Sequence, residues 1–144
     1  VCIGTDGAAS NNTLDMFAEM RLAALLAKGY SGNPEAVPAH AALEMVTINA
    51  ARALGLEDRI GSLEAGKQAD LVAVDLDQLE TLPVHHVVSQ LVYATGRHQV
   101  SDVWVKGREL VRDRQLKTLD EHQIRTESAV WQRRLARIDQ QTKG

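Results

Sequence analysis

The sequence lacks the features that would assign it to several broad classes. It has a single cysteine, Cys2, so no internal disulfide can form, and this fits a cytoplasmic protein. No apolar stretch approaches the roughly 20 residues that cross a bilayer. No basic leader precedes an apolar region, so we expect neither a secretory signal nor a membrane partner. The net charge of −3 leaves no basic excess, which argues against binding to nucleic acid.

The composition is that of a globular protein. Of the 144 residues, 44% are hydrophobic and 24% are charged, and this length corresponds to one ordinary domain. The sequence has no initiator methionine and opens inside an apolar run that predicts a buried strand. We therefore expect the chain to be a segment of a longer protein.

Asp6 is the first candidate functional residue. The apolar run before it predicts a strand, and residues 7–12 predict a loop that leads into a helix. In parallel α/β architectures, and above all in (β/α)8 barrels, catalytic and metal-binding groups lie at the carboxyl ends of the strands. The alternative is that Asp6 only caps the turn, as aspartate often does.

Apolar residues recur at helical spacing in four stretches, which we predict to be helices: 13–28, 38–54, 83–94 and 118–144. Asn12 is the expected cap of the first helix, and Gly29 is its expected end. The last helix is expected to dock on the body through its apolar face, which comprises Ile124, Trp131, Leu135 and Ile138.

After Gly55 the pattern changes to short β-like runs, so a domain boundary is expected there. The predicted strands are 60–63, 71–74, 100–105 and 109–111. Lys106 and Gly107 lie between the last two and predict a hairpin. The alternation of apolar residues suggests a sheet with one buried face, as in a small sandwich. Cys2, in the first apolar run, is expected to be a small buried hydrophobe.

The sequence does not predict a complete metal site. Zinc sites commonly use H-x-H on a strand or H-x-x-x-H on a helix, and neither spacing occurs. The motif G-x-S-x-G of serine nucleophiles is also absent, and Cys2 has no evident histidine partner. We interpret the histidines as surface or packing residues: His40, His85, His86, His98 and His122.

Four segments of the sequence together resemble one protein family. They are GTDGAASNNTLDMFAEMRLAALLAK, GLEDRIGSLEAGKQADLVAVD, SQLVYA and VSDVWVKGRELV. They resemble the C-terminal part of amidohydrolase-superfamily aminohydrolases, and the likeness runs from residue 1 to about residue 116. The motif G-S-L-E-x-G-K-x-A-D-L-V is specific to the superfamily. GTDGAASNN with LDMF points to the methylthioadenosine/S-adenosylhomocysteine deaminases, which are grouped loosely with triazine hydrolases and guanine deaminases.

The resemblance implies an α/β fold made of two incomplete domains. Residues 1–54 would be the last strand and the helices of a (β/α)8 barrel of the metal-dependent hydrolase type. Residues 55–117 would be the C-terminal part of a β-sandwich with the helix 83–94 inserted, and residues 118–144 a C-terminal helix. The chain would be truncated, and the remaining strands of both domains would precede Val1.

The resemblance also assigns a role to Asp6. It matches the strand-8 aspartate that is at once a metal ligand, a catalytic group and a contact to the substrate. One divalent transition metal, with zinc expected, would bring the pKa of a water to about 7, and the carboxylate would accept and return its proton. The remaining metal ligands and the glutamate that protonates the substrate ring would lie before Val1.

Neighbouring residues are interpreted as structural. Ser10, Asn11 and Asn12 match the family's loop, and we expect them to form caps and turns that hold Asp6 in place. Asp70 and Lys67 belong to the sandwich motif and are expected to lie far from the barrel mouth.

Three functions stay open at this point. The first is hydrolytic deamination of an adenosine thioether, a small nucleoside, to the inosine derivative and ammonia, in a protein that the family suggests is a homo-oligomer. The second keeps the fold but acts as a guanine deaminase or a triazine hydrolase. The third is a non-catalytic interaction module. Residues 1–144 alone are expected to be inactive, because one carboxylate does not make a metal site.

Overall fold

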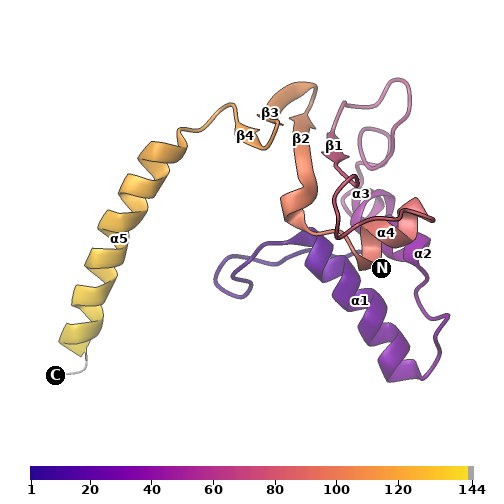
Figure 1. Cartoon of the computed structure of the whole chain (residues 1–144), viewed down its shortest axis with the longest axis horizontal. Helices are drawn as coiled ribbons and strands as arrows, with labels where there is room; N and C mark the ends of the chain where they lie inside the picture. The colour runs from indigo at the N-terminus through magenta and orange to yellow at the C-terminus, as the bar shows by residue number, and fades with distance from the viewer. Residues whose placement is uncertain (143–144) are drawn as a thin grey trace.

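Helices and an antiparallel sheet lie next to each other in this chain, and a long helix extends away from both (Figure 1). The structure, a computed structural model, describes residues 1–142. Its elements are α1 (Met16–Ser31), α2 (Ala39–Val46), α3 (Ile48–Ala53), β1 (Leu71–Val74), α4 (Val87–Tyr93), the 3-10 turn η1 (Arg97–Gln99), β2 (Val100–Val105), β3 (Arg108–Arg112), β4 (Gln115–Leu116) and α5 (Glu121–Thr142). The expected mixed α/β composition is confirmed.

Helix α1 has different ends from those expected. The side chain of Asp15 caps it by accepting two amide hydrogen bonds from the first turn. The preceding residue, Leu14, has a φ of 47° and cannot continue a helix, so Asn12 is not the cap. At the other end Gly32 has a φ of 64° and closes the helix in the left-handed conformation. Gly29 lies inside the helix, and its prediction as the end was wrong.

The helix predicted over residues 38–54 is two shorter helices, α2 and α3, which meet at Thr47. The backbone of Thr47 is not helical, with φ −123° and ψ −101°. Its hydroxyl donates to the carbonyl of Leu43 at 2.7 Å. Such a bond to the residue four positions earlier bends helices, which accounts for the break. Helix α3 stops before Gly55 as expected, and Gly55 has a φ of 67°.

The buried core lies where α1, α2 and α4 meet. Met20 and Ala24 of α1 pack against Ala42 of α2 and Val92 of α4, and all four are at most 2% exposed. Because two of the four are alanines, the helix backbones approach one another closely. This contact joins segments that are about seventy residues apart in the sequence.

Helix α4 confirms the central part of the helix predicted over 83–94. It starts after His86, whose Nδ1 accepts a hydrogen bond from an amide of the first turn. Arg21 of α1 donates from Nε to the carbonyl of Val92 at 3.2 Å and from a terminal nitrogen to the carbonyl of Thr95 at 2.6 Å. Those two carbonyls lie at the end of α4, where a helix leaves carbonyls unpaired, so Arg21 fixes α4 to α1.

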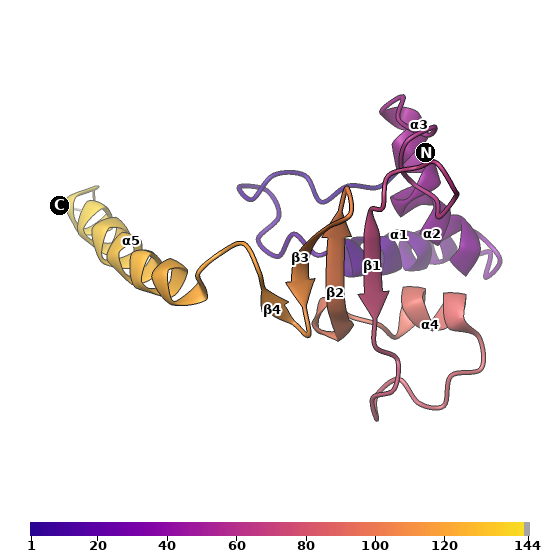
Figure 2. The same cartoon turned by 90° about the horizontal axis from the view of Figure 1, so that it is seen from above.

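The sheet has the strand order β1-β2-β3-β4, and each neighbouring pair is antiparallel. The predicted hairpin is confirmed: β2 and β3 are joined by Lys106 and Gly107, with φ values of 53° and 74°. Two positive φ values suit a two-residue hairpin turn. The predicted strand 71–74 is also confirmed, as β1. Figure 2 shows the four strands in this order, with α5 beyond β4.

Two features of the sheet region differ from expectation. Residues 60–63 do not form a strand, because Gly61 has a φ of 90° and its backbone lies against α3 and the end of α2. Strand β4 was not predicted. It pairs with β3 after a turn at Asp113 and Arg114, where both residues have positive φ although neither is glycine.

Residues 1–6 pair with no strand among the described residues, so the strand expected there stays a prediction. A β-strand forms by hydrogen bonding to a neighbouring strand. In this segment the amide of Ile3 donates instead to the carbonyl of Met45, which lies in α2. Ile3 and Thr5 are half-buried and their neighbours are exposed, which is the alternation of an extended segment. Cys2 is exposed, so its predicted burial was wrong.

The terminal helix forms but does not dock. Helix α5 stands apart from the body in Figures 1 and 2, and Trp131, the expected packing anchor, is 56% exposed. The docking prediction was therefore wrong: Ile124, Trp131 and Leu135 of its apolar face are 43%, 56% and 57% exposed. Asp120 caps the helix by accepting from two amides of the first turn. Residues 143–144 of the predicted range lie outside the described residues. Over residues 1–142 no helix combines the length and the apolar character needed to cross a membrane.

Gly61 provides a test of this packing. A Cβ at Gly61 would lie 2.7 Å from the Cβ of Ala51, whereas a Cβ at Gly66, which has nearly the same φ (94°), would meet nothing within 4 Å. Both replacements by alanine carry the strain of a positive φ, but only Gly61→Ala adds a clash. Thermal unfolding of the complete protein should show Gly61→Ala to be less stable than Gly66→Ala by about 1–3 kcal/mol. Equal unfolding midpoints would contradict the packing described.

Candidate metal centre

Asp6 presents a carboxylate with hydrogen bonds to both oxygens. The amide of Gly7 donates to Oδ1 at 2.7 Å, and the hydroxyl of Ser10 donates to Oδ2 at 2.8 Å. Asp6 itself has a φ of 59°, a left-handed conformation that aspartate tolerates better than most residues. This conformation turns the chain sharply at the end of the extended segment. The carboxylate thereby has a fixed orientation at the start of the loop.

The hydrogen bonds also fix the charge of this group. The Ser10 hydroxyl, and after it the Gly7 amide, hold the pKa of the Asp6 carboxyl below its ordinary value. Asp6 is exposed, so burial opposes this effect only weakly. It is ionised at neutral pH. A carboxylate oxygen has two lone pairs, so each oxygen that accepts one hydrogen bond can still bind a cation.

The loop after Asp6 is closed by an internal turn and is tied to α1 through Asn11. The carbonyl of Gly7 accepts from the amides of Ser10 and Asn11 at 3.0 and 2.9 Å, closing a turn. The side chain of Asn11 then donates to Glu19 of α1 at 2.6 Å. Figures 1 and 2 show this loop, at the indigo end of the chain, standing out from the helices. Ser10 and Asn11 therefore hold the loop and the carboxylate, as expected.

Two residues that hold the loop were missed at the level of the sequence. Glu19 receives the amide of Asn11, and Arg97 in η1 donates to the carbonyl of Thr13 at 2.9 Å. Arg97 is 84 positions from Thr13, so no local pattern could have indicated the contact. The sequence explains Glu19 as an acidic residue in the first turn of a helix, where it interacts favourably with the helix dipole. It gives no sign that Glu19 also accepts a hydrogen bond from Asn11.

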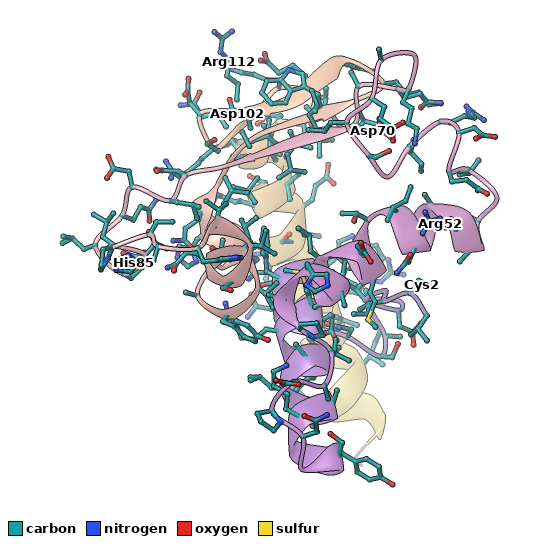
Figure 3. The ribbon with its side chains drawn as sticks, turned by 90° about the vertical axis from the view of Figure 1, so that its right-hand side faces the viewer. Cys2, Arg52, Asp70, His85, Asp102 and Arg112 are labelled. Carbon is teal, nitrogen blue, oxygen red and sulfur yellow. The ribbon has the colours of Figure 1, made fainter. Side chains whose placement is uncertain are left out.

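Asp70 and Lys67 have structural roles, as expected. Asp70 accepts the amide of Lys106 at 2.6 Å and so supports the hairpin turn. Lys67 donates to Ser62 at 2.6 Å and lies 3.1 Å from Glu64. Figure 3 shows Asp70 on the side of the sheet and Cys2 on the side of the helices. Neither Asp70 nor Lys67 is a partner of Asp6.

The histidines do not assemble around Asp6. All five are exposed, as expected for surface residues. His98 lies 3.4 Å from Glu80, and Figure 3 shows His85 on the opposite side of the view from Cys2. Within residues 1–142 no group of three or more histidine, cysteine, aspartate or glutamate side chains could hold a metal ion. Asp6 is therefore not part of such a group within the described residues.

A large cavity of the described chain is not part of this site. It has a volume of about 730 Å³ and lies between the helices and β1, with Phe17, Val46 and Leu71 in its wall. Its lining is almost entirely apolar, and Asp6 does not contribute to it. An apolar cavity without convergent polar groups does not have the character of a catalytic site.

Comparison with known proteins identifies the family. The model of the amidohydrolase family matches residues 1–110. The 5-methylthioadenosine/S-adenosylhomocysteine deaminase of Teredinibacter turnerae is 54% identical over 135 residues, which are 94% of this chain and 30% of that protein. The protein of the same name from Halobacterium salinarum is 46% identical over 129 residues, 90% of this chain and 30% of its own length.

Solved structures give the same result. An adenosine deaminase from Xanthomonas campestris with bound zinc has a TM-score of 0.90 and 52% identity, covering 94% of this chain and 31% of that one. A zinc complex of atrazine chlorohydrolase from Arthrobacter aurescens has a TM-score of 0.79 and 31% identity, covering 86% and 28%. The chain spans about 30% of the length of the curated relatives it matches. Since the family model matches residues 1–110 of 144, the chain belongs to the amidohydrolase family.

Proposed function

We propose that the complete protein deaminates methylthioadenosine or S-adenosylhomocysteine by hydrolysis, giving the inosine derivative and ammonia. The observation that carries this proposal is the identity of 54% to a relative of that name over 94% of the chain. Relatives of the same name from distant organisms are 41–56% identical. The non-catalytic interaction module that the sequence left open has no comparable support.

Asp6 is the residue of this chain that we assign to the metal and to the reaction. Its carboxylate is ionised, exposed and oriented by Gly7 and Ser10, and hard oxygen ligands suit a divalent cation. Two related structures contain zinc, which supports a divalent transition metal with zinc as the proposed ion. In this proposal Asp6 is one ligand, and residues outside positions 1–142 complete the site.

The chemistry divides between the metal and the carboxylate. When bound, the metal lowers the pKa of a water so that the nucleophile is available at neutral pH. Asp6 takes the proton of the attacking water and returns it to the departing amino group, acting first as a general base and then as a general acid. The same carboxylate lies against the substrate at the reacting carbon. Ser10 and the loop hold Asp6 in one orientation through both proton transfers.

The proposal includes a domain arrangement. Residues 1–54 would belong to a (β/α)8 barrel in which residues 1–6 are the last strand, and their alternating burial supports this once a neighbouring strand is present. Residues 55–117 would belong to a β-sandwich, with the sheet β1–β4 as its part here, and residues 118–144, which include α5, would be the C-terminal helical part. Helix α4 packs on α1 and α2 and so would bridge the two domains. The protein would act on a small nucleoside in the cytoplasm.

A second candidate reaction is hydrolytic dechlorination of a triazine. It is favoured by the likeness to the atrazine chlorohydrolase, at 31% identity and a TM-score of 0.79. Both reactions add water at a ring carbon and expel a leaving group, so one metal and one aspartate suit both. The lower identity makes this the weaker candidate.

A substrate panel tests the proposed activity. The complete protein is assayed for release of ammonia from methylthioadenosine, S-adenosylhomocysteine and guanine, and for release of chloride from atrazine. We expect kcat/KM for one of the adenosine thioethers to exceed that for guanine and atrazine by about 100-fold or more. Preferential turnover of atrazine would establish the second candidate instead. Absence of turnover on all four by the zinc-loaded protein would contradict both.

The role of Asp6 is tested by replacing it with a neutral isostere. In the complete protein, Asp6→Asn removes the charge and the basic oxygen, so turnover should fall by at least about 100-fold. Bound zinc, measured by elemental analysis, should fall as well. Asp70→Asn is the matched control: it alters a carboxylate that supports a turn elsewhere, and turnover should persist in the folded variant. Full activity of Asp6→Asn would remove Asp6 from the mechanism.

The hydrogen bond from Ser10 predicts a pH effect with a definite sign. Because this bond lowers the pKa of Asp6, Ser10→Ala should raise that pKa toward its ordinary value. Asp6 then binds its proton at a higher pH, and the acidic limb of the kcat/KM profile moves upward in pH. Carboxyl-carbon NMR titration of the metal-free protein measures the same shift directly. Ser31→Ala, whose hydroxyl donates to Ala27 at the end of α1, should leave the pKa of Asp6 unchanged.

A further inference from the structure

Helix α5 carries an apolar stripe that nothing in the described chain covers. Ile124, Trp131 and Leu135 recur at intervals of seven and four residues and so lie on one face of the helix. Their side chains are 43%, 56% and 57% exposed. Figures 1 and 2 agree that the helix stands clear of both the sheet and the other helices. These three side chains form an exposed apolar surface within the described residues.

An isolated helix of this kind needs a partner. Helix α5 has 22 residues and is about 33 Å long. In proteins most helical stability comes from packing an amphipathic face, not from intrinsic propensity. The related Xanthomonas deaminase structure matches 94% of this chain, and since α5 holds 22 of the 144 residues, that match includes part of the helix. Because Ile124, Trp131 and Leu135 are exposed among the described residues, a partner for the stripe would come from outside them.

The charges of α5 and of its capping residue, Asp120, are divided between the two halves of this segment. Residues 120–130 contain three carboxylates, Asp120, Glu121 and Glu127, against one arginine, Arg125. Residues 131–142 contain three arginines, which are Arg133, Arg134 and Arg137, against one aspartate. The first half is acidic and the second basic. Two such helices attract each other when they run in opposite directions and repel each other when they run in parallel.

Opposite charges also lie beside the centre of the stripe, on Glu127 and Arg134. Trp131 is the eleventh of the 22 residues of α5, with Glu127 four residues before it and Arg134 three residues after it. Both charged residues lie on the same side of the stripe, and the Arg134 guanidinium lies 5.0 Å from the centre of the Trp131 ring. In an antiparallel pair centred near Trp131, Glu127 of one helix would therefore face Arg134 of the other, twice.

We propose that α5 is a dimerisation helix that pairs antiparallel with α5 of a second copy of this chain. The contact is isologous, so a two-fold axis passes close to Trp131. Two tryptophans are then buried at the centre of the interface, where contributions to binding are largest. The surface does not include Asp6, and the proposal does not depend on the proposed reaction. Failure of the dimerisation test would not affect the proposed reaction, and failure of the activity test would not affect the proposed dimer.

Sedimentation of the complete protein over a range of concentrations tests the apolar part of the proposal. The wild type should be a dimer, and Trp131→Glu should weaken dimerisation by about 30-fold or more. Tyr30→Glu is the matched control, since Tyr30 is an aromatic residue that is 97% exposed but lies at the end of α1. It should leave the dimer unchanged. Circular dichroism checks that each variant is folded.

Charge reversal tests the antiparallel arrangement. In a dimer of the Glu127→Arg variant, an arginine at position 127 faces Arg134 of the other helix at both symmetric places. In a dimer of the Arg134→Glu variant, two carboxylates face each other in the same way. Each variant alone should therefore dimerise at least about tenfold more weakly than the wild type. An equimolar mixture of the two restores both pairs and should form a heterodimer. A monomeric wild type would overturn the proposal, as would a dimer insensitive to Trp131→Glu. Failure of the mixture to associate would overturn the antiparallel pairing.

Discussion

The contact between α1 and α4 is the constraint on which the rest of the structure depends. Met20 and Ala24 bury Val92, and Arg21 spans two carbonyls at the end of α4. Because helix α1 is held in this way, it provides a fixed base for the loop that precedes it. The loop is attached to α1 by the hydrogen bond from Asn11 to Glu19, and Asp6 lies at the N-terminal end of the loop, where it accepts from Ser10. The candidate metal ligand is thus positioned by a core contact made some seventy residues later in the sequence.

The same constraint explains how the helices and the sheet are joined. The chain leaves α4 through η1, where Arg97 reaches back to the loop before α1, and then enters β2 directly. The buried Thr95 and Gln99 lie in this connection. Thr95 accepts from Arg21 and donates to a carbonyl of α4, and the side-chain oxygen of Gln99 accepts from the amide of Gly96, whereas the Nε2 of Gln99 has no hydrogen-bond partner among the described residues. Movement of α4 would therefore disturb the loop of Asp6 and the central strand of the sheet together.

Local chemistry determined which elements could be predicted. Lys106 and Gly107 indicated a hairpin because a glycine after a lysine can take the positive φ of a tight turn. The turn at Asp113 and Arg114 has the same conformation without a glycine, so β4 left no signal in the sequence. The ends of α1 were misplaced because Asn12, Asp15, Gly29 and Gly32 are all plausible boundaries, and tertiary contacts of the loop select among them. Docking of α5 on the body was predicted only from the apolar residues along one face of the helix. Such a face indicates that the helix packs against something, but it does not identify the surface that covers it.

For the candidate site, the sequence identified the carboxylate and its loop but not the contacts that hold them. Asp6 stood out because it follows an apolar run, and Ser10 was recognised as a residue of the turn. The contacts of Glu19 and Arg97 arise only from the fold. The role of metal ligand came from the family resemblance, because one carboxylate has no spacing from which a metal site could be inferred.

A crystal structure of the complete protein with zinc, with anomalous data at the zinc edge, tests the central claim most directly. Our account predicts zinc within about 2.0–2.2 Å of a carboxylate oxygen of Asp6, with the Ser10 hydrogen bond retained. Zinc bound at a site that does not include Asp6 would contradict it.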